Sequence, residues 1–158
     1  MKKRGFALVA TLLLCLILFA LGSGLLSKQS ALYEGSMQQV RAAQARALAQ
    51  TGLQDALAKL MRDDSFPPLS SEGQQVFSYT EDLSDLDGRP AGSYNVQIDR
   101  SLARRPWYVM RITSQGRVGD SRYTLRGELD VALKRRSQPG LDNPDLFHWI
   151  QVEDLSGL

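Results

Sequence analysis

The sequence of 158 residues lacks most of the side-chain chemistry that enzymes use. It has one histidine and one cysteine, Cys15, and no pattern typical of a serine nucleophile, a phosphate-binding loop or a zinc site. A lone cysteine cannot form an intramolecular disulfide, so packing alone must hold any folded part together. We therefore predict that the chain is not an enzyme and that it uses no cofactor.

Charge is absent from Phe6 to Leu26. A helix of that length is about 30 Å long, which matches the hydrocarbon core of a bilayer. Three cations at residues 2–4 come directly before the segment, and only Lys28 follows it closely. Because cations flanking a membrane helix stay on the cytoplasmic side, we expect one membrane-spanning helix with a cytoplasmic N-terminus and an exported remainder.

A cleaved secretory signal is an alternative interpretation of this segment. Ala20 and Gly22 stand three and one residues before Ser23, a spacing that a signal peptidase accepts. Cleavage there would release a soluble protein. The apolar pattern continues without a break into a longer helix, however, and this continuity favours an anchor that stays attached.

The overall charge of the chain does not demand a polyanionic partner. The sequence has 19 lysines and arginines against 17 acids, and removal of the three cations at 2–4 leaves 16. After the long N-terminal helix, roughly 100 residues remain for a globular part, which is enough for one small domain.

Residues 27–62 predict an amphipathic continuation of the membrane helix. Helix formers dominate this segment, and proline is absent from it. Small and apolar residues recur at intervals of three and four: Ala45, Ala49, Leu53, Ala56, Leu57 and Leu60. Pro67 and Pro68 cannot continue a helix. We expect one helix from Phe6 to about Arg62.

The segment 63–133 predicts a small antiparallel sheet. Residues 76–80 and 94–98 are short strand candidates separated by an acidic loop at 81–92, and the clearest pair is 107–118 with 121–133. The two-residue turn between the last two strands sets their register. That register aligns three apolar pairs on one face: Ile112 with Gly127, Met110 with Leu129, and Tyr108 with Val131. On the other face it sets Arg111 opposite Glu128.

Residues 134–158 form a basic linker followed by an aromatic tail. Asn143, Pro144 and Asp145 predict the start of a helix, with a cap, a proline in the first turn and an early acid. The tail at 146–150 either packs on its own sheet or docks on another subunit, and we favour the first. The predicted fold is α+β, with a long N-terminal helix packed against a small antiparallel sheet.

The motif at residues 2–6, Lys-Lys-Arg-Gly-Phe, followed by an apolar helix, resembles the signal of a type IV prepilin. More narrowly, residues 4–9 with the leucine-rich run behind them are similar to the PilX-type minor pilins and the K-type minor pseudopilin of type II secretion. The resemblance implies a leader of residues 1–5, removed by prepilin peptidase after Gly5, and methylation of Phe6. It also implies a pilin-like fold.

The same resemblance implies how the chain would assemble. Helix residues that would pack against other pilin helices in a filament core at 6–26 are Phe6, Leu8, Val9, Leu12 and Leu16. Most pilins carry glutamate where this chain has Ala10, and that carboxylate pairs with the terminal amine of the subunit above. A subunit with nothing above it needs no such charge. Ala10 therefore implies a place in the filament tip or initiation complex.

The implied partners are other minor pilins or pseudopilins, the major pilin and prepilin peptidase. The implied location is the bacterial inner membrane, with a periplasmic head, and then a periplasmic or extracellular filament. The alternative hypothesis is a single-pass anchored or secreted module that recognises DNA or a surface ligand.

Two ligand sites are weaker hypotheses. The acids Asp82, Asp85 and Asp87 could offer oxygen ligands to calcium, but their spacing does not match an EF-hand loop, and solvated turn residues are the favoured explanation. A basic patch that could contact DNA is formed by Arg104, Arg105, Lys134, Arg135 and Arg136. A solvated, alternately charged surface explains the same cations without a ligand.

Overall fold

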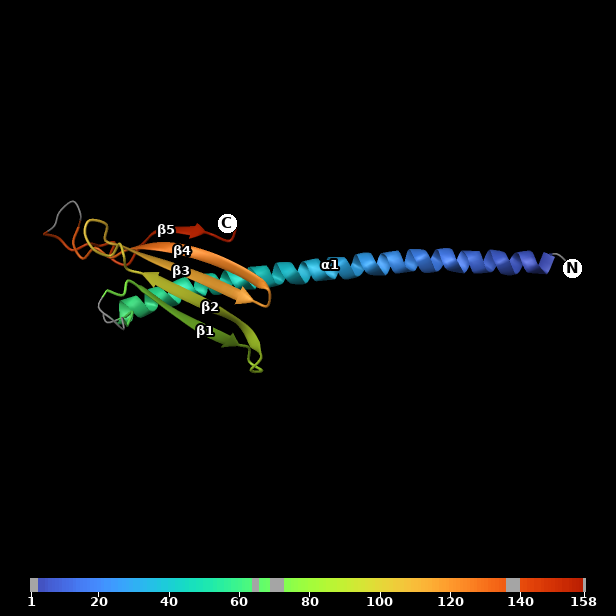
Figure 1. Ribbon diagram of the computed structural model, residues 1–158, viewed down its shortest axis with the longest axis horizontal. Helices are drawn as coiled ribbons and strands as arrows, with labels where there is room; N and C mark the ends of the chain where they lie inside the picture. The colour runs from blue at the N-terminus through green and yellow to red at the C-terminus, as the bar shows by residue number, and fades with distance from the viewer. Residues whose placement is uncertain (1–2, 64–65, 69–72, 136–139, 158) are drawn as a thin grey trace. The chain divides into compact units, whose positions relative to one another are not determined.

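The computed structural model describes residues 3–63, 66–68, 73–135 and 140–157, without the side chains of 3–8 and 25–27. These residues form an α+β fold with one helix and an antiparallel sheet of five strands (Figure 1). The elements are α1 (Lys3–Arg62), β1 (Val76–Ser84), β2 (Pro90–Asp99), β3 (Val109–Val118), β4 (Ser121–Asp130) and β5 (Trp149–Asp154). The predicted fold class is confirmed.

The chain divides into two compact units. The first, residues 1–40, holds the apolar part of α1. The second, residues 41–158, holds the remainder of α1 and the whole sheet, and we call it the head. The helix ends where the sequence predicts, because Pro67 and Pro68 follow, and Lys59 and Arg62 place positive charge in its last turn.

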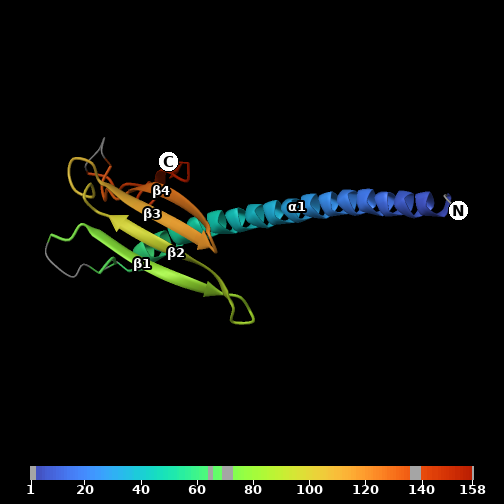
Figure 2. The ribbon, with the colours of Figure 1, turned by 45° about the vertical axis from the view of Figure 1, so that its right-hand side comes forward.

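The strands of the head follow each other in sequence order, and each pairs antiparallel with the next (Figure 1). Figure 2 shows β1 to β4 in this order. The predicted hairpin register is confirmed, with Ile112 opposite Gly127 and Met110 opposite Leu129. The pairing of Tyr108 with Val131 continues just beyond the strands, where the Val131 amide donates to the Tyr108 carbonyl. The Arg111 Nε to Glu128 Oε1 distance is 2.9 Å, so the predicted ion pair is present.

Several strand boundaries differ from the prediction, and β3 begins at Val109 rather than at residue 107. β1 runs to Ser84 and β2 begins at Pro90, so the predicted acidic loop at 81–92 shrinks to a tight turn over residues 85–89. Pairing with β2 extends β1 through Glu81 and Asp82, whose residues lie on exposed positions that do not bury their charges. β4 ends at Asp130 rather than Leu133.

The helix predicted after Asn143 is wrong, because the chain makes a turn there and then enters β5. The Asn143 side chain does accept a hydrogen bond from the Asp145 amide, as a cap would. Phe147 then adopts a left-handed φ of 59°, and its amide donates to Asp130 of β4. Pairing with β4 therefore overrides the local helix signal. The tail packs on its own head, as favoured.

One face of α1 and one face of the sheet form the core of the head. The buried helix residues are Ala45, Ala49, Leu53, Ala56 and Leu60, at the predicted spacing, and Leu57 is partly buried. Side chains from β2, β3 and β4 meet them: Tyr94, Val96, Ile98, Met110, Ile112, Leu125 and Leu129. Backbones come close at Gly116, where an added Cβ would lie 2.1 Å from the Ala45 carbonyl oxygen.

An ion-pair network joins the last turns of α1 to β1. Lys59 Nζ lies 2.7 Å from Asp55 Oδ2 and 2.6 Å from Glu81 Oε1, and Tyr79 donates its hydroxyl to the same Asp55 oxygen at 2.7 Å. Burial alone would raise the pKa of Asp55, but the hydrogen bonds from Lys59 and Tyr79 outweigh it and lower that pKa. Burial also raises the pKa of Tyr94 to about 12.

We predict that Gly116→Ala lowers the free energy of unfolding of the head by about 1–3 kcal/mol, because the added methyl group pushes α1 off the sheet. Denaturant unfolding of the full chain in detergent, followed by circular dichroism, measures the change. Gly157→Ala is the matched control, since nothing lies within 4 Å of the added Cβ. Equal stability of the two variants would contradict the close backbone contact.

We predict that Asp55→Asn destabilises the head by about 1–2 kcal/mol at neutral pH, because it removes the charge that Lys59 and Tyr79 both contact. The folded pKa of Asp55 is lowered. Its stabilisation is therefore full above the ordinary aspartate pKa of about 3.9 and is lost as the pH falls through the folded value.

The measurement is unfolding of wild type and variant from pH 7 downward. The free energies of unfolding of wild type and Asp55→Asn should become equal only below about pH 4. Asp82→Asn, an exposed change on β1, serves as the control and should alter stability by less than about 0.5 kcal/mol. A difference that stays constant into strong acid would show that the Asp55 charge does not stabilise the head.

Candidate functional site

The first candidate site is the exposed apolar surface of α1 in the first unit. α1 is long and apolar enough to cross a membrane. Between Val9 and Leu21, the large apolar side chains that are more than half exposed are Val9, Leu12, Leu13, Leu14, Leu16, Ile17, Leu18, Phe19 and Leu21. A helix that is apolar on every side suits lipid or other helices as its surroundings.

The predicted processing and assembly residues all lie in the first turns of α1. Gly5, Phe6 and Leu8 are helical, and the side chains of Phe6 and Leu8 lie outside the described residues. Val9 and Ala10 are exposed. Leu12 and Leu16 are exposed as well, and their spacing from Val9 places these three apolar residues along one side of the helix.

A second group of exposed apolar residues continues along the same helix. Leu32, Tyr33, Met37 and Val40 are exposed to between 39% and 68%, and they recur at helical spacing. This group was not predicted from the sequence, because the predicted apolar face of the helix rested on the small residues that begin at Ala45. The spacing of these four residues was the available signal. A soluble helix rarely leaves such a row uncovered, so this surface is a candidate for contact with other helices.

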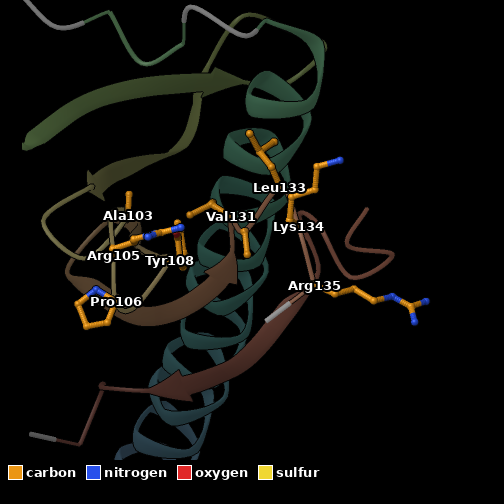
Figure 3. A pocket seen from close by; sticks show the side chains of 9 residues that line it. Ala103, Arg105, Pro106, Tyr108, Val131, Leu133, Lys134 and Arg135 are labelled. Carbon is orange, nitrogen blue, oxygen red and sulfur yellow. The ribbon is translucent and has the colours of Figure 1, made fainter. Parts of the chain in front are cut away.

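The predicted basic patch lies at one end of the sheet, where β2 leads into β3 and where β4 ends. Arg105, Lys134 and Arg135 line a single cavity of about 690 Å³, which we call the basic pocket (Figure 3). Its other lining residues are mostly aliphatic: Ala103, Pro106, Tyr108, Val131, Ala132 and Leu133. Arg104 is exposed beside the pocket without lining it, and Arg136 lies outside the described residues.

The cations of the basic pocket do not converge on one point. Arg105 donates from Nε to the Tyr108 hydroxyl at 2.8 Å, whereas the Lys134 and Arg135 side chains extend away from Arg105 (Figure 3). Lys134 Nζ lies 2.5 Å from Asp142 Oδ1, and its hydrogen bond lowers the pKa of that carboxyl. Tyr108 has a left-handed φ of 52°, an unusual conformation for a bulky residue.

The three candidate calcium ligands lie in two different settings. Asp82 belongs to β1, whereas Asp85 and Asp87 lie in the turn between β1 and β2. Asp85 Oδ1 accepts hydrogen bonds from the amides of Asp87 at 2.9 Å and Arg89 at 2.8 Å, so this carboxylate organises the turn. Within the described parts of the chain, no three His, Cys, Asp or Glu side chains cluster as metal ligands would.

No protein-family model, curated protein or solved structure matches this chain.

Proposed function

We propose that this chain is a minor pilin or minor pseudopilin, a structural subunit of a type IV pilus or a type II secretion pseudopilus. The observation that carries the proposal is the prepilin-like motif at residues 2–6, placed directly at the start of one unbroken apolar helix. That helix exposes its apolar residues through its first part and meets a sheet only from Ala45 onward. A simple anchor needs no such continuous scaffold.

In this proposal the chain works by association, without chemistry. Before assembly, α1 holds the protein in the bacterial inner membrane, with the N-terminus cytoplasmic and the head periplasmic. Prepilin peptidase cuts after Gly5, and the exposed residues Val9, Leu12 and Leu16 then exchange lipid for the helices of other minor and major pilins. The row from Leu32 to Val40 extends that helix contact beyond the membrane-spanning length.

The alanine at position 10 supports the proposal that the subunit belongs to the tip or initiation complex. A carboxylate inside an apolar helix array is costly unless a cation neutralises it. In pilins the amine of the subunit above supplies that cation. Ala10 removes the need for a subunit above, which suits the first subunit of a filament.

We predict that mass spectrometry of the protein from its native host finds a methylated Phe6 as the first residue. Gly5→Val should abolish this processing, because a β-branched side chain replaces the glycine at the cleavage site. Gly22→Val is the matched control: it disrupts the alternative signal-peptidase site before Ser23 and should leave processing at Phe6 intact.

The other outcomes overturn the proposal in distinct ways. A protein that begins at Ser23, and whose cleavage before Ser23 is blocked by Gly22→Val but not by Gly5→Val, is a secreted domain. A protein that keeps Met1 or Lys2 in the presence of an active prepilin peptidase is an ordinary membrane anchor.

We predict that Ala10→Glu lowers incorporation of the subunit into filaments, because no neighbour above supplies a cation for the new carboxylate. Ala10→Leu keeps the position apolar and should assemble as the wild type does. The measurement is the amount of each variant in sheared filaments relative to the membrane fraction. Full incorporation of Ala10→Glu would show that a subunit does lie above this one.

A further inference from the structure

Leu86 stands uncovered at the turn between β1 and β2. Its exposed fraction of 107% is the largest among the exposed large apolar residues of the described chain. Asp85 and Asp87 flank it, and Arg89 is the cation of the same turn. Residues 85–89 form the acidic tip. A leucine in this position contributes no packing to its own head, so its fold does not explain it.

The acidic tip has a defined shape. The Asp85 amide donates to the Arg89 carbonyl at 2.9 Å, and the Gly88 amide donates to the Asp85 carbonyl at 3.0 Å. The Asp85 carboxylate accepts two further backbone amides, and Gly88 adopts the left-handed φ of 77° that closes the turn. This hydrogen bonding fixes the backbone of the turn, so little backbone freedom is lost if the tip docks.

The acidic tip and the basic pocket occupy opposite ends of one sheet. The tip follows Ser84 of β1, whereas the pocket is built by the loop after Asp99 of β2 and by the residues after Asp130 of β4. Figures 1 and 2 show the β1–β2 turn and the loop before β3 at the two ends of the strands. A tip therefore cannot reach the pocket of its own head.

The chemistry of the two ends is complementary. The pocket offers an aliphatic surface that includes Val131 and Leu133, with Leu133 71% exposed. Arg105 and Arg135 line it, and neither forms an ion pair with a residue that the structure describes. The tip offers one aliphatic side chain between two carboxylates. If the tip enters the pocket, Leu86 is buried against the aliphatic lining, and the carboxylates of the tip pair with the arginines of the pocket.

One cation that lines the pocket already pairs with a carboxylate of its own chain. Asp142 contacts Lys134, and backbone hydrogen bonds from Arg135 to Leu141 and from Asn143 to Leu133 align that segment with the pocket rim. The cations diverge, so one small anion cannot contact them all. Tyr108 is the single aromatic residue among the lining residues, a poor surface for the stacked bases of a nucleic acid.

We propose that the acidic tip of one copy docks in the basic pocket of a second copy, with Leu86 against Val131 and Leu133 and with Asp87 beside Arg105. Because the two surfaces differ and lie at opposite ends of the head, the contact is head-to-tail and does not close in a pair. Successive copies form a head-to-tail series, which is open or closes into a ring according to the rotation between neighbours. This contact goes beyond the proposed function and needs no processing at Gly5.

The test uses two full-length variants in detergent, each broken at one end. Leu86→Asp destroys the tip and keeps the pocket, whereas Leu133→Asp destroys the pocket and keeps the tip. Both residues are exposed, so neither change disturbs the core of the head. Ile150→Asp, the same change at a half-exposed residue of β5, is the matched control. Sedimentation velocity measures the assemblies.

We expect wild type and Ile150→Asp to form a concentration-dependent series of oligomers, and each tip or pocket variant alone to lose that series. An equimolar mixture of the two variants should form dimers and nothing larger. In each dimer the intact tip of one variant occupies the intact pocket of the other, and the two surfaces left free are both mutated. Arg105→Gln should weaken dimer formation about tenfold, the effect of losing one favourable charge pair.

Three results would overturn the proposal. Unchanged oligomers of Leu86→Asp would show that association does not use the tip. A mixture that stays as dissociated as its components would show that tip and pocket do not meet. The third result is a wild type that forms no oligomers but binds a fluorescent oligothymidine probe, with that binding abolished by Leu133→Asp. This result would assign the pocket to nucleic acid. All three leave the processing test at Gly5 unaffected, since the chain used here is unprocessed.

Discussion

The close approach of the α1 backbone to the sheet is the constraint on which the head depends. At Gly116 a Cβ would overlap the Ala45 carbonyl, and at Gly52 it would overlap the Ser114 hydroxyl. With backbones this near, Leu53 and Leu60 of α1 join Ile98 and Ile112 of the sheet in one buried cluster. Small residues at the contact between α1 and the sheet thus hold the head together by packing, since Cys15 has no partner cysteine for a disulfide.

Much of this fold could be predicted because independent signals agreed. For the β3–β4 hairpin, the alternation of apolar residues and the two-residue turn indicate the same register, and the ion pair from Arg111 to Glu128 follows from it. The helix was predictable from its length and from the prolines that end it. β5 was not, because its position comes from pairing with β4 and from Trp149 lying over Gly127, contacts distant in sequence.

The candidate sites were predictable in part, for physical reasons. The hairpin register brings the start of β3 beside the end of β4, so the proximity of Arg105 to Lys134 follows from a pairing that the sequence predicts. The cavity between them depends on the loop before Tyr108, which carries no periodic signal. Leu86 lies in the segment predicted as an acidic loop, and nothing in the sequence indicates that its side chain is exposed. Its exposure follows from the pairing of β1 with β2, which leaves only a tight turn around it.

The order of the strands has a consequence for how the head forms. Each strand pairs with its neighbour in sequence, so the sheet can grow one hairpin at a time, and the turns at 85–89 and 119–120 close with little loss of chain entropy. The apolar face of α1, made first, stays uncovered until β2 and β3 have formed the surface that buries it. During synthesis the apolar face of α1 is therefore exposed before the sheet forms, and in that interval it is accessible to chaperones or to neighbouring helices.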